Sequence, residues 1–213
     1  HQPWGDLGID LCLGMPIDKR ASSYEYMFLP DYLEAGLNYA YIVEGGEKKP
    51  LVKDTVISYE SSSEPDAVGL WQPLTFTLAL MLIGLVASYI SFKTGKYQVW
   101  FDVALFSLSG LLGWFLVFLW FFTDHHAADY NLNILWALPW NFPLSFFLLK
   151  RPLAKFLRGH YLVLFFWYLL VAITFFVLPQ DLHYSLFPLV LLLAVRAWLA
   201  SRPRAYPRQK VKA

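Results

Sequence analysis

Five long apolar runs dominate the chain after residue 69. They extend over roughly residues 70–92, 99–123, 132–149, 161–178 and 185–199. A helix needs about 20 residues to cross the roughly 30 Å of bilayer hydrocarbon. The first two runs meet that length easily, whereas the third carries Pro139 and Pro143 and the fifth has Pro188 near its start. Because proline removes a backbone donor, we expect a kink or a re-entrant segment in the third run.

The charges between the runs favour five crossings. With five spans, every cation after residue 70 falls on one side of the membrane, namely Lys93, Lys96, Lys150, Arg151, Lys155, Arg158, Arg196, Arg202, Arg204, Arg208, Lys210 and Lys212. The other side receives Asp124, Asp129 and Asp181 without any Lys or Arg. Membrane proteins keep their basic loops in the cytoplasm. We therefore predict five spans, with the first segment periplasmic and the C-terminus cytoplasmic.

The segment before the apolar runs has a different pattern. Helical spacing of apolar residues begins at Pro3 and again at Pro30, residues 51–59 alternate as a strand would, and residues 61–66 are polar. About sixty residues rarely form a stable core alone, so we expect this segment to complete a larger domain. The predicted organisation is a periplasmic remnant (1–60), a linker (61–69), a five-helix transmembrane domain (70–200) and a basic cytoplasmic tail (201–213).

The composition agrees with a lipid environment and indicates which class of partner the chain contacts. The chain is 57% hydrophobic and only 15% charged, whereas soluble domains carry about 25% charged residues. Most of the acidic residues precede residue 70 and most of the basic residues follow it. Because the cations flank apolar runs, anionic lipid explains them better than nucleic acid, which we exclude as a partner. The single cysteine, Cys12, excludes an internal disulfide, and we expect it to fill a small apolar space.

Polar residues near or within the runs are the candidates for chemistry. The candidate polar cluster consists of Asp124, His125, Asn131, Asn133 and Asn141. Asp and His can bind metal or move protons near neutral pH, but the spacing matches no established ligand motif. A polar loop that caps helices, or a structural hydrogen-bond network, explains the same residues. We therefore assign no catalytic residue, no metal site and no cofactor.

The apolar runs themselves contain charged, polar and glycine residues that predict specific contacts. Asp102 lies near the start of the second run, where its closeness to the membrane border favours an interfacial carboxylate and where Lys96 or Arg158 could pair with it. Arg196 lies near enough to the tail for its charge to reach water. Asn141 lies between two prolines, where packing between helices competes with a midplane binding site. Gly110 and Gly113 predict a close helix contact in the second run.

Several short strings, in this order, resemble the Lnb-type bacterial envelope proteins: Pro3-Trp4-Gly5-Asp6-Leu7-Gly8-Ile9-Asp10-Leu11, Tyr26-Met27-Phe28-Leu29-Pro30-Asp31-Tyr32-Leu33, Trp120-Phe121-Phe122-Thr123-Asp124-His125 and Asn133-Ile134-Leu135-Trp136-Ala137. The resemblance covers nearly the whole chain. It implies a periplasmic domain of cysteine-peptidase-like fold joined to five transmembrane helices. The family's catalytic His and Cys segments lie earlier than any residue of this chain, so the resemblance transfers no catalytic residue.

These observations lead to one functional expectation and two alternatives. The chain is expected to be an all-α polytopic membrane protein, a five-helix bundle preceded by a partial α/β periplasmic segment, that anchors an envelope protein in the bacterial inner membrane. Its partners would be the lipid bilayer and other envelope proteins, and any hydrolase activity would reside upstream. The alternatives are a small transporter or lipid-handling protein, and an intramembrane enzyme that uses Asp124 and His125.

Overall fold

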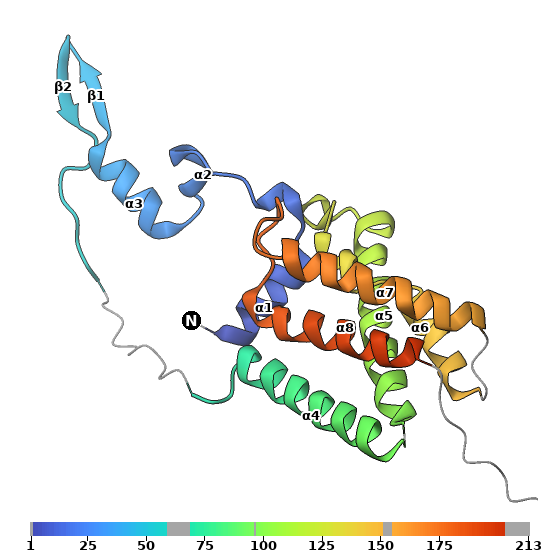
Figure 1. Cartoon of the computed structure of the whole chain (residues 1–213). Coiled ribbons are helices and arrows are strands. Elements are labelled where there is room, and N and C mark those ends of the chain that lie inside the picture. The colour runs from blue at the N-terminus through green and yellow to red at the C-terminus, as the bar shows by residue number, and fades with distance from the viewer. Residues whose placement is uncertain (1, 59–68, 96, 151–154, 203–213) are drawn as a thin grey trace, which may run out of the picture. The chain divides into compact units, whose positions relative to one another are not determined.

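The computed structural model describes residues 2–58, 69–95, 97–150 and 155–202. It is mostly helical, as Figure 1 shows. The contacts divide the chain into two units, one of residues 1–18 with residues 67–213 and one of residues 19–66. Of the predicted linker only residue 69, and of the predicted tail only residues 201 and 202, lie within the described residues. Residues 2–18 thus group with the helices that follow residue 67.

The unit of residues 19–66 consists of two helices and a hairpin. Its elements are α2 (Ser23–Tyr26), α3 (Pro30–Tyr39), β1 (Tyr41–Glu44) and β2 (Glu47–Pro50). The predicted helix from Pro30 is confirmed. The predicted strand at residues 51–59 is wrong, because Gly45 and Gly46, both at positive φ, close an antiparallel hairpin that pairs Glu44 with Glu47. Two glycines at such a turn fix the strand register, and residues 51–58 follow the hairpin without strand structure.

Four helices of the other unit are long and apolar enough to cross a membrane. These are α4 (Pro73–Thr94), α5 (Val99–Phe122), α7 (Lys155–Thr174) and the segment that comprises the 3₁₀ helix η5 (Tyr184–Leu186) and α8 (Phe187–Ser201). Their bounds agree with four of the predicted runs within a few residues, except that α7 begins and ends earlier than expected. Helix α1 (Pro3–Cys12) is also as predicted, with Pro3 at its first position, and a 3₁₀ turn η1 (Met15–Ile17) follows it.

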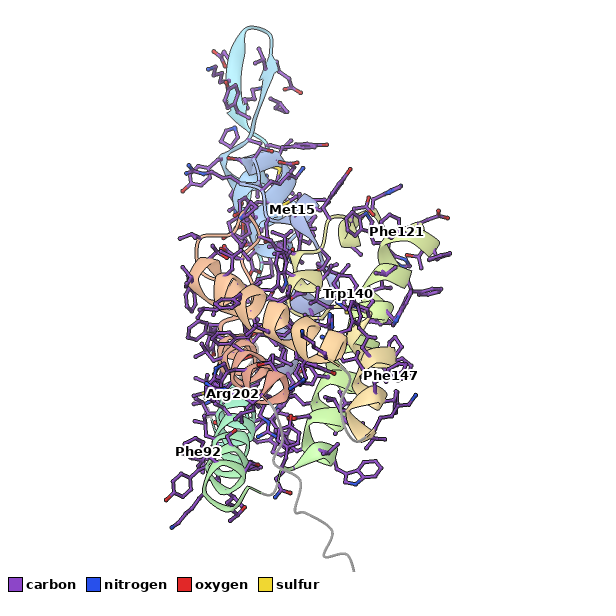
Figure 2. All side chains as sticks on the ribbon, turned by 45° about the vertical axis from the view of Figure 1, so that its right-hand side comes forward. Met15, Phe92, Phe121, Trp140, Phe147 and Arg202 are labelled. Atoms are coloured by element: carbon purple, nitrogen blue, oxygen red, sulfur yellow. The ribbon has the colours of Figure 1, made fainter. Side chains whose placement is uncertain are left out.

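The third apolar run is not one helix. It consists of the 3₁₀ helix η3 (Leu132–Leu135), the short helix α6 (Asn141–Ser145) and the 3₁₀ helix η4 (Phe146–Leu149), after the 3₁₀ helix η2 (His126–Ala128). We call residues 132–149 the broken segment. In Figure 2, Phe121 lies toward one end of the bundle, Trp140 lies midway and Phe147 lies toward the other end. The broken segment therefore passes through the depth of the bundle, and the break that the prolines predicted is confirmed.

The broken segment lies directly against α5. A side chain at Gly113 would meet the Ala137 oxygen at 1.8 Å, and one at Gly110 would meet the Phe142 nitrogen at 2.2 Å. The close contact predicted for these glycines is thus confirmed, although the partner is the broken backbone and not a regular helix. Fully buried side chains from α5, α7, α8 and the broken segment form the core, namely Phe106, Tyr168, Val190, Leu193, Ala137 and Leu148.

The two ends of the bundle differ in character. Met15 and Phe121 lie toward one end, which we call the α1 end, and Phe92 and Arg202 lie toward the other (Figure 2). The helix termini that carry Lys93, Lys155 and Arg202 share this second end, which we call the basic end. The cations at these three helix termini are therefore gathered at one end of the bundle, as the charge pattern after residue 70 predicted.

Candidate functional site

The candidate polar cluster is divided into three separate places. Asp124 and His125 lie exposed in the loop after α5. The Asp–His pair that forms in this loop joins His126 Nδ1 to Asp129 Oδ2 at 3.4 Å, with the imidazole almost fully exposed. Within the described ranges, no group of three His, Cys, Asp or Glu side chains could hold a metal ion. The loop therefore lacks the buried, convergent geometry that a reactive site requires.

Asn131 and Asn133 lie in a second place, against α1. The last carbonyls of a helix have no partner within the helix. Here Asn133 Nδ2 donates to the Asp10 oxygen and Asn131 Nδ2 donates to the Leu11 oxygen, each at 2.8 Å. Gln180 Nε2 donates to the Leu13 oxygen at 2.9 Å. We call Asn131, Asn133 and Gln180 the amide clamp, and all three side chains are at most 2% exposed.

The oxygens of the amide clamp are also occupied. Asn131 Oδ1 accepts from the Asn133 nitrogen at 2.9 Å, Asn133 Oδ1 accepts from Trp136 Nε1 at 3.0 Å, and Gln180 Oε1 accepts from the Leu132 nitrogen at 2.6 Å. The Trp136 and Leu132 contacts fix the amides to the start of the broken segment. A buried polar network in which the donors and acceptors are paired is rigid and holds one geometry.

Two further contacts hold the chain that follows α1. The Gly14 nitrogen donates to the Ala127 oxygen at 2.8 Å, and a side chain at Gly14 would meet the Asp129 oxygen at 2.0 Å. Asp18 Oδ2 accepts from the Asp181 nitrogen at 3.1 Å. The glycine is required because two backbones approach each other too closely for a Cβ atom. Residues 10–18 are thus held along the loops at the α1 end.

The titratable groups of α1 respond to this packing. Burial raises the pKa of Asp10, and the nearby His183 opposes the rise. Burial also raises the pKa of the Cys12 thiol. A thiol with a raised pKa is a poor nucleophile. The Cys12 side chain is half-buried, and not fully buried as expected. His183 itself is buried, and its Nδ1 accepts from the Ser185 nitrogen at 3.2 Å at the start of η5.

Asn141 lies in a third place, within the bundle. Its Nδ2 donates to the Tyr168 hydroxyl at 2.6 Å and to Ser109 Oγ at 3.3 Å. Among the described residues, Asn141 Oδ1 has no hydrogen-bond partner. Asn141 joins α5 and α7 to the broken segment, which is the packing role that the sequence allowed for it.

The donors that the prolines remove are replaced from neighbouring elements. Pro139 has no N–H, so the oxygen of Leu135, four residues earlier, receives no helical bond. The indole nitrogen of Trp167 donates to this oxygen at 2.7 Å. The Pro139 oxygen accepts from the Phe142 nitrogen at 3.2 Å. These bonds explain how a non-helical backbone is tolerated within a membrane-spanning bundle.

The most deeply buried charges were placed incorrectly by sequence reasoning. Asp102 pairs with Arg196, whose charge was expected to reach water, and neither side chain is exposed at all. Lys96, one of the two partners suggested for Asp102, lies outside the described residues. Arg196 Nε donates to Asp102 Oδ1, Arg196 Nη1 donates to Ser88 Oγ at 2.9 Å, and the Tyr97 hydroxyl donates to Asp102 Oδ2. The pair therefore joins α4, α5 and α8 near the basic end.

The sequence held one signal for this pair. Each charge is the single ionisable residue within its apolar run, and each stands a few residues from the basic end. Opposite charges at equal depth in neighbouring spans are expected to pair, because hydrocarbon offers no other partner. Gln180 was not among the predicted site residues, because nothing around it in the sequence indicates that its amide binds the end of α1.

Comparison with known proteins identifies one match. The family model of the Lnb transmembrane domain matches residues 64–204. No curated protein matches the chain, and no solved structure does. The matched residues include all four long helices, the broken segment and the amide clamp, but not α1.

Proposed function

Because the chain belongs to the Lnb transmembrane-domain family, we propose that it forms the membrane-anchoring part of a bacterial cell-envelope protein and holds a periplasmic domain at the inner membrane. The amide clamp is the observation that carries this proposal. It binds three backbone oxygens of the segment that precedes the membrane part in sequence. A tether requires only a covalent linker, whereas a clamp of buried amides fixes the position of what it binds.

Recognition by the clamp depends on the end of α1. The amides donate to carbonyl oxygens at the C-terminal end of α1, which have no partner within the helix. These bonds therefore form only when residues 3–12 are helical and the helix ends at Cys12. The bundle therefore receives α1 as a folded element. We infer that the bundle retains the segment that leads into the periplasmic domain by more than a covalent link.

The distribution of charge supports the orientation in this proposal. Phe92 and Arg202 lie toward the basic end and Phe121 lies toward the other (Figure 2). Lys93 follows Phe92 directly in the sequence, and Asp124 follows Phe121 after two residues. The basic end is the cytoplasmic one under the positive-inside rule. The α1 end is then periplasmic, on the side where an envelope domain would lie.

Catalysis is not part of this proposal. Asp124 and His125 are exposed and form no buried pair, so no geometry favours an intramembrane enzyme at this loop. Any cysteine-peptidase-like activity would reside in residues that precede His1 in the full-length protein, and residues 19–58 would then belong to the same periplasmic domain.

The test is whether the clamp holds α1. In full-length protein in lipid nanodiscs, Asn133→Ala leaves the Asp10 oxygen and the Trp136 indole without their partners, at a cost of about 1–3 kcal/mol. Amide hydrogen exchange over residues 3–13 is therefore expected to accelerate, while α5 and α7 keep their protection. Asn38→Ala removes an exposed asparagine from the other unit and serves as the control.

Two results would contradict the proposal. If residues 3–13 exchange freely in the wild-type protein, α1 is not held and the bundle is only a tether. If Asn133→Ala accelerates exchange throughout the bundle to the same extent as in α1, the amide stabilises the bundle itself and has no separate docking role.

A further inference from the structure

A crevice of about 240 Å³ opens between α4 and α5. Leu80 of α4 and Ala104 and Leu108 of α5 line it, together with Leu189 of α8 and Trp136, which follows η3. Figure 1 shows α4 and α5 running in different directions and not side by side along their length. The crevice therefore occupies the angle between two consecutive helices that pack on α8 more than on each other.

The basic end of the crevice is closed. A side chain at Gly84 of α4 would meet Leu192 of α8 at 2.3 Å and the Phe101 ring at 3.1 Å. Phe101 also lies under the guanidinium of Arg196, with 5.2 Å between the Arg196 carbon and the ring centroid. Since Arg196 is fully buried and already paired with Asp102, it offers no charge to a ligand in the crevice.

The depth of the crevice determines its surroundings. Its α5 residues run from Phe101 to Leu112, and α5 extends from Val99 to Phe122. At 1.5 Å per residue, the lining therefore reaches from near the basic end to the middle of the helix. At this depth a crevice between spanning helices meets hydrocarbon and not water.

The lining also indicates the chemistry of the occupant. Two lining residues, Ser109 and Trp136, have a polar side-chain atom. The Ser109 hydroxyl donates to the Phe106 oxygen at 3.1 Å and accepts from Asn141, and Trp136 Nε1 donates to Asn133 Oδ1 at 3.0 Å. The polar side-chain atoms of the lining already have partners within the protein, so a ligand in the crevice needs no hydrogen-bonding group. An unbranched hydrocarbon chain fits such a wall better than any polar ligand.

We propose that this crevice binds one hydrocarbon chain of a membrane phospholipid. A water molecule occupies about 30 Å³ of liquid, and a methylene group is of similar size, so a volume of about 240 Å³ holds on the order of eight methylenes. The bound lipid fills the angle between α4 and α5 and links α4 to the rest of the bundle.

The proposal is tested with a phosphatidylethanolamine that carries a photoreactive diazirine at the middle of one acyl chain, in nanodiscs with the full-length protein. Peptide mapping after irradiation is expected to show labelling of Ala104 and Leu108 several-fold above that of Leu82. Leu82 is the matched reference because its exposure, 63%, is close to the 68% of Leu108, while it does not line the crevice.

Two substitutions separate a bound chain from ordinary bilayer contact. Ala104→Trp fills the crevice and should lower the labelling at Leu108 to that of Leu82, whereas Ala79→Trp, on an exposed position of α4 outside the crevice, should leave it unchanged. Leu108→Ala widens the crevice and should keep or raise the labelling at Ala104. Equal labelling of Leu108 and Leu82 in the wild-type protein, or labelling that persists in a folded Ala104→Trp variant, would overturn the proposal. If Ala104→Trp does not fold, loss of the Ala104 signal in Leu108→Ala would overturn it instead.

Discussion

Trp167→Phe tests how the bundle tolerates a broken backbone. The substitution keeps an aromatic ring but removes the indole N–H that donates to the Leu135 oxygen at 2.7 Å. Pro139 cannot supply that bond, and the 36% of Trp167 that is exposed faces lipid, which has no donor to replace it. The carbonyl would therefore be left without its partner.

The expected magnitude follows from the location of this bond. Hydrogen bonds between membrane helices contribute about 0.6–2 kcal/mol, and an unsatisfied buried polar group costs about 1–3 kcal/mol. We expect Trp167→Phe to lower the free energy of unfolding by about 1–2 kcal/mol. For a protein of this size, that corresponds to a fall in Tm of about 2–8 °C.

The assay is thermal unfolding in a single detergent, with Trp114→Phe as the matched control. Trp114 lies on α5 with 51% of its surface exposed, so its substitution changes the same atoms at a bilayer-facing position. Equal Tm values for the two variants would refute the reasoning, because the indole bond would then contribute nothing beyond the loss of ring area.

Three further predictions concern charge, close packing and pH. Arg196→Met should lower the free energy of unfolding, measured with denaturant, by about 3–5 kcal/mol, because it removes the cation that pairs with the buried Asp102. Adding Asp102→Asn should restore most of this loss, and equal stability of the single and double variants would exclude the pair as the cause. Gly113→Ala should abolish stable expression, since its Cβ would overlap a backbone oxygen of the broken segment, whereas Gly159→Ala, with open space around it, should be neutral by the same thermal assay. Burial raises the folded-state pKa of Asp10 above its usual 3.8. The contribution of Asp10 to α1 docking is therefore fully present below that value and is lost as the pH rises through the folded pKa. The Asp10→Asn variant should match the wild-type protection of α1 against hydrogen exchange in acid and exceed it at neutral pH, and a difference that stays constant with pH would contradict this.

The third apolar run shows what apolar length and proline placement can predict about a membrane-spanning segment. Its length and its prolines indicated a kinked or re-entrant element, and the one-sided cations required it to cross. Both indications hold, because the run passes through the bundle in short helical pieces. The sequence could not indicate which groups would satisfy the freed carbonyls, since Trp167 stands 32 residues from Leu135.

Sequence alone determined the elements whose cause is local. Hydrocarbon forces every backbone donor and acceptor to pair within the element, so apolar length located α4, α5, α7 and α8, and proline placement located the starts of α1 and α3. The same local logic failed for the hairpin, where the Gly45-Gly46 turn was overlooked and the strand was placed after it. That error came from a signal that was present in the sequence and not used.

Only the tertiary structure decided which polar residues meet. Asn131 and Asn133 were grouped with Asp124 and His125 because they are near in sequence, yet they bind α1, whose carbonyls are 120 and 123 residues away. Asp102 and Arg196 are separated by 94 residues and still form the buried pair. Helix packing sets such distances, and periodicity carries no information about them. A chain's own residues thus specify where it crosses lipid, while the packed bundle specifies what each polar group binds there.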